Sequence, residues 1–350
     1  WEQNIRRVKP YTPGEQPAGK NLVKLNTNEN PYPPSPLVEK ALKEMDPADF
    51  RKYPDPSSGV LVEALSEFYG VEPERIFVGV GSDDVLGMAF LTFFNSERPI
   101  LFPSVTYSFY PVWADLFRIP WETVAVDEQM RISPEDFKRE NGGVIFPNPN
   151  APTGLALPLA QVEEIVAANQ DSVVIVDEAY IDFGGDSAME LTRSYENLLV
   201  VQTFSKSRAM AGMRIGFAVG NPVLIRALND VKYSYNSYTM SLAAQKLGAA
   251  AVKDREYFEE SRRKIIKTRE EAKKRLAELG FTFPDSQTNF IFAKHMRAKA
   301  EPMFQALKEA GIYVRYFKTT GLEDWLRISI GTDEEMEKLY RFLKGYLPRQ

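Results

Sequence analysis

The residues of this chain that are best suited to chemistry surround Lys206. This lysine ends the segment TFSK (203–206), and Arg214 follows it eight residues later. Upstream, Asp177 comes directly after a run of four β-branched residues, and Tyr180 lies three residues further on. A run of this kind is typical of a buried parallel strand, and ligands of open α/β sheets bind at the carboxyl ends of such strands.

These residue types together suit one cofactor, pyridoxal 5′-phosphate (PLP). Its aldehyde needs an amine, which Lys206 supplies, and the freed lysine amine then moves a proton between the substrate Cα and the cofactor. Asp177 is the counter-charge expected for the ring nitrogen, and the Tyr180 hydroxyl is expected to bond the phenolic oxygen. We therefore predict Lys206, Asp177 and Tyr180 as catalytic. The groups expected to hold the phosphate are Thr203, Ser205 and Arg214, of which the arginine offers a bidentate fork.

Each residue taken singly has a plainer interpretation. A lysine after a strand is usually a solvated surface residue, and an aspartate there is often a turn or helix N-cap residue. Their joint occurrence in this order favours the cofactor site over the plainer interpretations.

The sequence resembles the fold-type I PLP-dependent aminotransferases, and among them the histidinol-phosphate aminotransferase family. The resemblance runs nearly end to end and is carried by the segments LNTNENP (25–31), YPD (53–55), GSDD (81–84), TYSFY (106–110), NPNAPTG (148–154), GIYVR (311–315) and LRISIGT (326–332). It implies an α/β fold: a large domain with a mostly parallel sheet of the seven-stranded type sandwiched by helices, and a smaller C-terminal α/β domain. It also implies transamination between L-histidinol phosphate and 2-oxoglutarate, which gives imidazole-acetol phosphate and L-glutamate in histidine biosynthesis.

The resemblance assigns further cofactor-binding residues. Ser82 and Asp83 lie where a strand joins a helix, and the free N–H groups there suit a phosphate, although an N-cap is the plainer interpretation. Tyr107 is expected to stack on the pyridine ring, with a core aromatic as the alternative. Tyr53 is expected to reach the phosphate of the other subunit's cofactor, so the resemblance implies a homodimer with a shared active site. The alternative for Tyr53 is a tyrosine that precedes a turn.

One segment departs from the family pattern. Many relatives read Asn-Asn-Pro-Thr-Gly, and their second asparagine bonds the phenolic oxygen of PLP. Here that position is Ala151. We expect Asn150 to take over the contact, or Tyr180 to serve alone.

Substrate recognition is expected to rest on arginines. Arg327 is predicted to pair with a substrate carboxylate, and Arg327 and Arg315 are the candidates for the phosphate of histidinol phosphate. A surface salt bridge is the plainer interpretation for either. The arm segment Asn28-Glu29-Asn30 is expected to close over the substrate, with Asn30 as a substrate-binding residue.

The pattern of the chain supports this organisation. We expect an N-terminal arm over 1–35, which packs with the small domain, a large PLP-binding domain over 36–254 and a small domain over 255–350. Strands and helices alternate from residue 76, which predicts a largely parallel sheet covered on both faces. The predicted helices of the large domain are 36–45, 60–69, one from 82, and 159–168. Its predicted strands are 76–80, 100–102, 144–146, 173–176, 198–202 and 215–219. A long helix over 256–279 leads to the predicted elements 290–292, 303–310, 313–315, 326–330 and 334–346.

Composition limits the classes of function. The 350 residues include 43 basic and 48 acidic side chains, a net charge of −5, without a basic stripe, so we expect no nucleic-acid partner. There is no cysteine and one histidine, His295, so neither a thiolate nucleophile nor a multi-histidine metal centre is expected. No apolar run predicts a membrane span or signal peptide. A cytoplasmic enzyme with an amino donor and a 2-oxo acid as its small-molecule partners is expected.

Several alternatives stay open. An aminotransferase of the same fold that acts on aromatic amino acids fits the aromatic-rich site, and a PLP decarboxylase of the threonine-phosphate type fits the cofactor motifs. A non-catalytic PLP-sensing domain lacks the expected helix-turn-helix or basic segment. A serine hydrolase lacks a Gly-x-Ser-x-Gly elbow.

Overall fold

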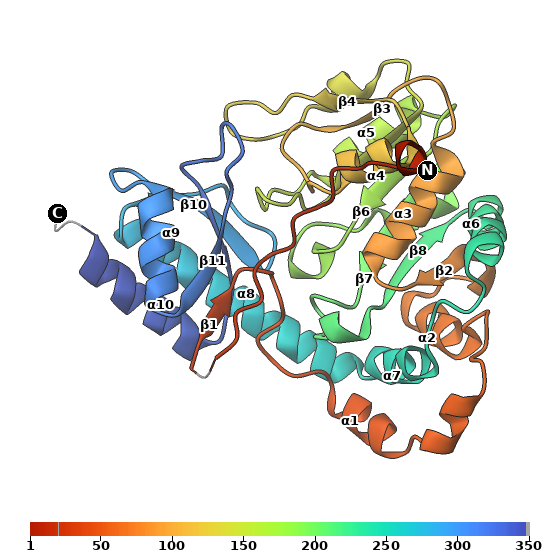
Figure 1. Cartoon of the computed structure of the whole chain (residues 1–350), viewed down its shortest axis with the longest axis horizontal. Coiled ribbons are helices and arrows are strands. Elements are labelled where there is room, and N and C mark those ends of the chain that lie inside the picture. Colours follow the sequence, from red (N-terminus) through yellow and green to blue (C-terminus); the bar gives the residue numbers. More distant parts are fainter. Residues whose placement is uncertain (20, 348–350) are drawn as a thin grey trace.

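The chain forms two β-sheets that lie side by side (Figure 1). The computed structural model describes residues 1–19 and 21–347. The larger sheet has seven strands in the order β2-β8-β7-β6-β5-β3-β4, and the smaller has five in the order β1-β11-β12-β10-β9. The α/β class and the mostly parallel sheet expected from the sequence are both confirmed.

The seven-stranded sheet is parallel except for β8, which runs antiparallel to both of its neighbours. Its strands are β2 (Ile76–Gly79), β3 (Ile100–Pro103), β4 (Trp121–Val124), β5 (Gly143–Pro147), β6 (Val174–Asp177), β7 (Leu198–Thr203) and β8 (Gly216–Gly220). Strands β5, β6 and β7 are buried along their whole length, as expected for a parallel sheet whose two faces are both covered by helices. In the register of β5, β6 and β7, Pro147 lies beside Asp177 and Asp177 beside Val201. The carboxyl ends of these strands therefore share one edge.

Helices cover both faces of this sheet because successive strand residues point to opposite sides. In β6, Ile175 packs with apolar residues of α3, α4 and α6, whereas Val174 and Val176 pack with those of α5. Helices α2 and α7 pack near the β2–β8 end of the sheet, with Phe217 and Val219. The helices are α1 (Pro36–Lys43), α2 (Gly59–Tyr69), α3 (Ser82–Phe93), α4 (Tyr110–Phe117), α5 (Leu159–Ala168), α6 (Pro222–Tyr235) and α7 (Leu242–Lys253).

The long helix α8 (Arg255–Glu278) connects the two sheets, and its buried residues Ile265, Ala272 and Leu276 join the core of the smaller one. The remaining elements of that lobe are β9 (Phe281–Thr282), β10 (Phe290–His295), α9 (Ala300–Glu309), β11 (Ile312–Tyr316), β12 (Leu326–Ser329) and α10 (Asp333–Tyr346). A reciprocal capping box between Thr332 and Glu335 begins α10.

Short 3₁₀ helices occur in the connections between these elements. They are η1 (Glu2–Asn4), η2 (Pro47–Arg51), η3 (Pro73–Arg75), η4 (Pro134–Phe137), η5 (Ile181–Phe183), η6 (Ala188–Arg193) and η7 (Ala211–Met213).

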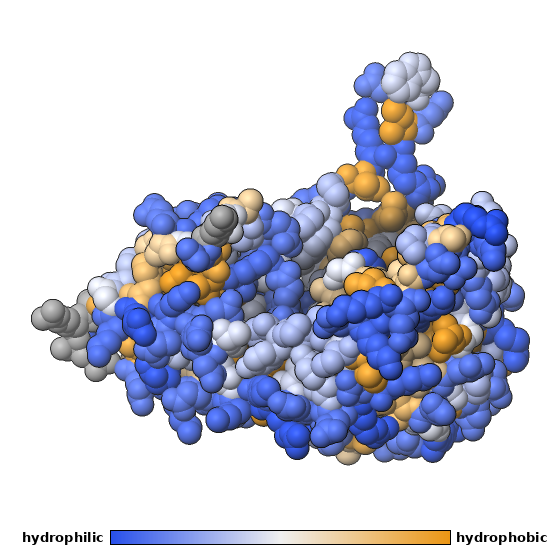
Figure 2. Space-filling view, turned by 90° about the horizontal axis from the view of Figure 1, so that it is seen from below, coloured by the Kyte–Doolittle hydropathy of each residue, from blue (hydrophilic) through white to orange (hydrophobic). Residues whose placement is uncertain are grey.

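The N-terminal arm contributes a strand to the smaller sheet. Strand β1 (Val23–Leu25) pairs in parallel with β11, so Val23 lies beside Ile312. Further towards the N-terminus, residues 1–10 are exposed and project from the body of the molecule (Figure 2). The sequence analysis did not predict β1, α4, β4, α6, α7 or β9. No helix in the described ranges is long and apolar enough to span a bilayer.

Candidate active site

A cavity of about 440 Å³ opens at the carboxyl edge of the seven-stranded sheet. Asp177 lines it from the end of β6, Thr203 from the end of β7 and Ser82 from the start of α3. The smaller sheet contributes Arg327 from β12, and Lys206 lies in the turn after β7. The cavity therefore gathers groups from both sheets, at the edge where open α/β sheets bind ligands.

Lys206 is held in this cavity by contacts to the N-terminal arm. Its Nζ donates to the carbonyl oxygen of Thr27 over 3.0 Å and lies 5.7 Å from the centroid of the Tyr180 ring. The Nδ2 of Asn30 donates to the carbonyl oxygens of Lys206 and Ser207, each over 3.1 Å. Asn30 does not line the cavity, so its role as a substrate-binding residue stays a prediction. Its amide is committed to the main chain of the lysine turn instead.

Asp177 lies at the floor of the site and is 4% exposed. Its Oδ2 accepts a hydrogen bond from Tyr110 Oη over 2.9 Å, and its Oδ1 accepts one from the Ala179 N–H over 3.2 Å. Burial raises the pKa of Asp177 to about 6, against these hydrogen bonds, which lower it. A cationic partner, such as a protonated ring nitrogen, would stabilise the ionised form of this buried carboxylate.

The start of α3 has the features of an anion site. Its first-turn N–H groups lack helical partners, and Gly81, with a positive φ of 86°, precedes it. A Cβ at Gly81 would lie 2.5 Å from Nη2 of Arg214, so a side chain here would displace the guanidinium from its present position. On the same side, the hydroxyls of Thr203 and Ser205 are hydrogen-bonded to each other over 3.0 Å and line the cavity.

The side chain of Asp83 organises this end of the site. Its Oδ2 accepts from Nη2 of Arg214 over 3.3 Å, and its Oδ1 accepts from Tyr107 Oη over 2.9 Å. A carboxylate repels a phosphate dianion, so any direct contribution of Asp83 to phosphate binding comes from its backbone N–H.

The two remaining predicted cofactor contacts lie elsewhere in this chain. Asn150 does not line the cavity, because its Nδ2 donates to the Val105 carbonyl and to Thr153 Oγ1, each over 2.9 Å. That Asn150 replaces the asparagine missing at Ala151 therefore stays a prediction, and these contacts do not support it. Tyr53 is 81% exposed and stacks on Tyr238 with ring centroids 4.6 Å apart, outside the cavity of its own chain.

Two arginines line the side of the cavity formed by the smaller sheet. Arg315 on β11 and Arg327 on β12 are directly opposed in the antiparallel register. Arg327 Nη2 donates to the Asn26 carbonyl over 3.3 Å, its Nε has no hydrogen-bond partner, and burial lowers its pKa. Neither arginine takes part in an ion pair within the described part of the chain. Two cations facing a cavity without a carboxylate partner suit an anionic ligand.

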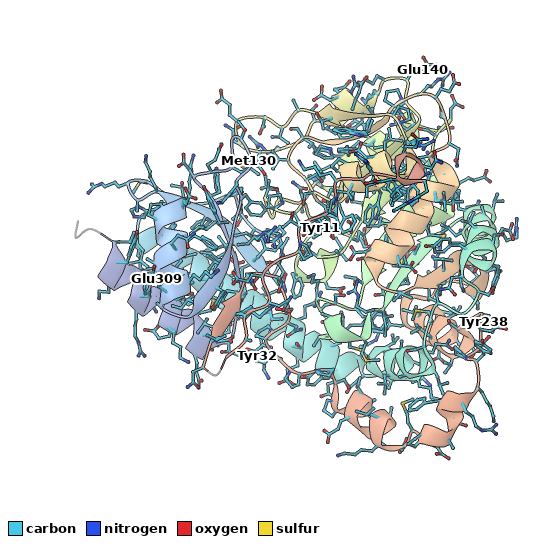
Figure 3. All side chains as sticks on the ribbon, viewed as in Figure 1. Tyr11, Tyr32, Met130, Glu140, Tyr238 and Glu309 are labelled. Atoms are coloured by element: carbon cyan, nitrogen blue, oxygen red, sulfur yellow. The ribbon has the colours of Figure 1, made fainter. Side chains whose placement is uncertain are left out.

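The cavity includes residues that sequence reasoning missed. Tyr11 lines it from the arm, stacks on Phe109 with centroids 4.6 Å apart, and lies between the two lobes in Figure 3. Gln16 also lines it, and Lys24 bonds the cavity residue Glu29. The arm is a proline-rich stretch without periodicity, so no local pattern signals these contacts.

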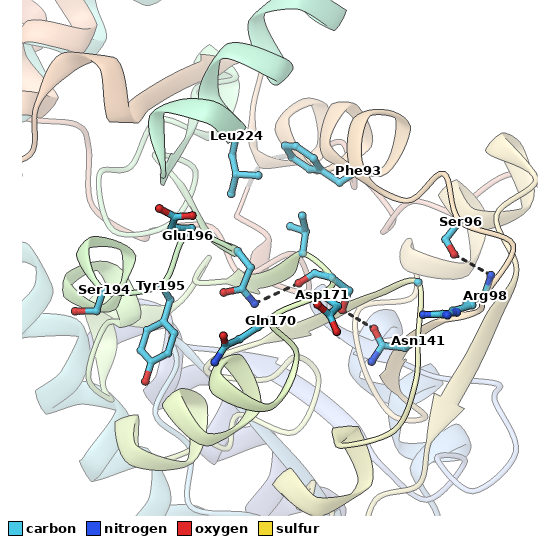
Figure 4. Close-up of a pocket in the computed structure, with 14 residues that line it drawn as sticks. Phe93, Ser96, Arg98, Asn141, Gln170, Asp171, Ser194, Tyr195, Glu196 and Leu224 are labelled. Atoms are coloured by element: carbon cyan, nitrogen blue, oxygen red, sulfur yellow. Dashed lines mark hydrogen bonds between the residues drawn. The ribbon is translucent and has the colours of Figure 1, made fainter.

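A second cavity lies at the opposite edge of the seven-stranded sheet (Figure 4). It measures about 660 Å³ and is lined by residues that precede β3, β5, β6 and β7, among them Arg98, Asn141, Asp171 and Tyr195. Its lining contains no lysine, so it offers no counterpart to Lys206. The carboxyl edge is therefore the candidate active site.

The fold and this constellation define the class of protein. The chain belongs to the family described as aminotransferase class I and II, whose model it matches over residues 20–343. It is 48% identical to the histidinol-phosphate aminotransferase of Lactococcus lactis subsp. cremoris, over 99% of this chain and 98% of that protein. It is 50% identical to histidinol-phosphate aminotransferase 1 of Hydrogenovibrio crunogenus, over 100% of this chain and 98% of the relative.

Solved structures agree on the fold. The histidinol-phosphate aminotransferase of Clostridium acetobutylicum superposes with a TM-score of 0.85 at 24% identity, over 93% of this chain and 98% of that one. The Sinorhizobium meliloti enzyme, solved in complex with PLP, superposes with a TM-score of 0.84 at 24% identity, over 93% and 92% of the two chains.

The residues of the cavity fit PLP. Lys206 would supply the amine for its aldehyde, and the buried Asp177 carboxylate would pair with its ring nitrogen. The α3 N-terminus, the Thr203 and Ser205 hydroxyls and the Arg214 guanidinium beside Gly81 form a cradle for its phosphate.

Proposed function

We propose that this chain is a PLP-dependent aminotransferase that moves the amino group of L-histidinol phosphate to 2-oxoglutarate, in histidine biosynthesis and in the cytoplasm. The observation that carries the proposal is that one cavity holds a lysine amine and two arginines that have no carboxylate partner among the described residues. The names of relatives at 48% and 50% identity over nearly the whole chain support the choice of substrate.

Some residues of the site are proposed to transfer protons, and others to bind and orient the reacting groups. When bound, PLP supplies a ring that accepts the electron pair left by the broken Cα–H bond. Lys206 Nζ would take this proton from the substrate Cα and return a proton during the transfer. The Asp177 carboxylate, which Tyr110 keeps oriented, would hold the ring nitrogen protonated. Tyr180 Oη would donate a hydrogen bond to the phenolic oxygen.

The arginine pair explains how one site accepts two different substrates in turn. 2-Oxoglutarate carries two carboxylates, whereas histidinol phosphate carries a phosphate and no carboxylate. The planar guanidinium of Arg327 or Arg315 matches either group with two parallel hydrogen bonds. The side chain of Arg327 is partly buried, so each charge-assisted bond to it is stronger than one made on the open surface.

The test follows the visible absorption of the PLP-loaded protein. Bleaching at low concentrations of L-histidinol phosphate, reversed by 2-oxoglutarate and much weaker with phenylalanine, is the expected result. Bleaching by aromatic amino acids alone would identify an aromatic amino acid as the amino donor instead. The tyrosines that line the cavity, Tyr11, Tyr107 and Tyr180, are the reason to include this measurement. Release of carbon dioxide in place of glutamate formation would indicate the decarboxylase alternative.

We also propose that two copies of the chain share their active sites. Tyr53 lies on an exposed apolar surface that includes Phe50, Val60, Tyr235 and Tyr238, with exposed fractions between 44% and 81%. Exposed apolar patches of this kind favour a protein–protein contact. The loop that carries Tyr53 is fixed from within, because the buried Lys232 donates to the Pro56 carbonyl over 2.8 Å. A preformed loop suits insertion into the cavity of a second copy.

Mixing two inactive variants tests this arrangement. A mixed dimer of Lys206→Ala and Tyr53→Ala chains has one site with both defects and one site with neither. Shared sites therefore predict that activity returns after the two variants are unfolded and refolded together, and that each variant refolded alone stays poorly active. A monomer in light scattering, or no recovery in the mixture, would contradict the proposal.

A further inference from the structure

Asn28 is an almost fully buried residue that links the arm to both sheets. It follows β1, is 1% exposed and has a left-handed backbone with a φ of 56°. Its Nδ2 donates to Tyr180 Oη over 2.9 Å, and its carbonyl accepts from Asn289 Nδ2 over 2.9 Å. Its N–H donates to Ser329 Oγ, which donates back to Asn28 Oδ1, each over 2.9 Å. These four hydrogen bonds fix both the backbone and the side chain of Asn28.

The contacts with Ser329 decide which end of the amide faces Tyr180. The Ser329 hydroxyl accepts the N–H of Asn28, so its own proton is available for Asn28 Oδ1. Nδ2 is therefore the end that faces Tyr180, and Tyr180 Oη accepts a hydrogen bond from it. The hydroxyl proton of Tyr180 has no acceptor within the described residues, although Tyr180 lines the cavity together with Lys206.

We infer that Asn28 is a positioning residue, which directs the O–H of Tyr180 into the cavity and towards the phenolic oxygen of bound PLP. The inference rests on the proposed function, because the acceptor belongs to the cofactor. Neighbouring side chains do not offer the same donor: Ala151 has no polar side chain, and the Asn150 amide is committed to Val105 and Thr153.

Asn28 also connects the two sheets through this hydroxyl. Ser329 lies on β12 and Asn289 directly precedes β10, both in the five-stranded sheet. Tyr180 lies in the loop after β6, in the seven-stranded sheet. Asn28, which is hydrogen-bonded to the smaller sheet, thus orients a hydroxyl that belongs to the larger one.

The test measures the pH midpoint of the visible absorption change of the PLP-loaded protein. A hydrogen bond donated to the phenolic oxygen favours its anionic form, so losing the bond raises the midpoint. Tyr180→Phe is expected to raise it by about one pH unit. Asn28→Gly removes the amide, suits the left-handed backbone, and is expected to raise the midpoint by a comparable amount.

A matched control separates the amide from the effect of a new glycine. Asn21 lies on the same arm, is exposed and has a φ of 63°, so Asn21→Gly makes the same exchange in the same backbone conformation. It is expected to leave the midpoint unchanged. The charged side chains that line the cavity are the same in every variant: Glu29, Asp83, Asp177, Lys206, Arg214, Arg315 and Arg327.

The double variant shows whether Asn28 acts through Tyr180. If it does, Asn28→Gly adds no further shift to Tyr180→Phe, because the hydroxyl it orients is gone. A shift of full size in the Tyr180→Phe background would overturn the inference, and so would a normal midpoint in folded Asn28→Gly. Should Asn28→Gly fail to fold, Ser329→Ala releases the amide and is expected to give a smaller upward shift, with an unchanged midpoint overturning the inference. A protein that never absorbs in the visible with PLP would instead contradict the proposed function.

Discussion

Tyr110 Oη lies 2.9 Å from Oδ2 of Asp177, and both side chains are buried beneath the cavity. The hydrogen bond keeps one carboxylate oxygen of Asp177 oriented, and the other oxygen accepts from the Ala179 N–H. Burial still raises the pKa of Asp177 to about 6. The two hydrogen bonds therefore do not fully offset the cost of burying the charge, which a neighbouring cation would reduce further. The site is therefore built to gain stability when a cationic ring binds.

The first prediction concerns the pH dependence of the cofactor-free protein. The pKa of Asp177 in the folded protein, about 6, lies above its ordinary value of 3.8, so its stabilising contribution is present at low pH and is lost as pH rises through 6. Compared with Asp177→Asn, the unmodified protein should lose roughly 2–3 kcal/mol of unfolding free energy between about pH 4 and pH 7. Urea unfolding across this range measures the difference. Glu178 and all other titratable groups are the same in the two proteins. A difference in unfolding free energy between them that does not vary with pH would therefore contradict the raised pKa of Asp177.

The second prediction concerns Lys206. Lys206→Ala removes the amine that the proposed mechanism uses for proton transfer, so turnover should fall by more than about 10³-fold. The exposed Lys338 on α10 provides a control, because Lys338→Ala removes a lysine far from the cavity and should leave turnover unchanged. A steady-state assay of glutamate formation decides the outcome. Ordinary turnover in Lys206→Ala would overturn the mechanism.

The third prediction concerns the arginine pair. Arg327→Gln removes charge-assisted hydrogen bonds worth about 1.5–3 kcal/mol, so kcat/KM should fall roughly 10- to 150-fold. The loss should appear for both histidinol phosphate and 2-oxoglutarate, since one guanidinium is proposed to serve both anions. Arg341→Gln is the control, because Arg341 is 77% exposed and pairs with Glu337 on the surface of α10. A loss confined to one substrate would show that Arg327 does not serve both.

The fourth prediction separates crowding at the phosphate cradle from backbone strain. Gly81 and Gly70 both have a positive φ, of 86° and 65°, although only Gly70 is in the left-handed helical region. A Cβ at Gly81 would lie 2.5 Å from Arg214 Nη2, whereas nothing lies within 4 Å of one at Gly70. Gly81→Ala and Gly70→Ala should each lose about 1 kcal/mol of stability or more. Only Gly81→Ala should weaken PLP binding, by about tenfold or more, in a titration of the cofactor-free protein.

Local patterns in the sequence predicted much of the architecture. The helix over 159–168 lies where it was predicted, because its apolar residues recur with helical spacing. The run of β-branched residues before Asp177 correctly predicted a buried parallel strand that ends at that residue. Three short strands escaped prediction. Three of the four residues of β4 are exposed, and β9 has only two residues. Strand β1 forms within the arm because it pairs with β11, almost three hundred residues away.

Two predicted site residues lie outside the cavity lining for a common physical reason. Asn30 and Asn150 have amides that suit a ligand, but the fold commits both to nearby chain atoms. A residue type states which hydrogen bonds a side chain is able to make. Only the folded neighbourhood decides which of those bonds are made.

By itself, the sequence determined the fold class, the catalytic chemistry and the order in which the reactive groups occur along the chain. Lys206, Asp177 and Arg214 lie on or next to strands whose apolar runs can be read locally, so they are recognisable before the chain folds. The tertiary structure alone decided that Arg315 and Arg327 face each other, that Tyr11 reaches the cavity and that Asn28 orients Tyr180. These relationships join segments far apart in the chain, and they depend on the strand register and on the packing of the arm between the two sheets.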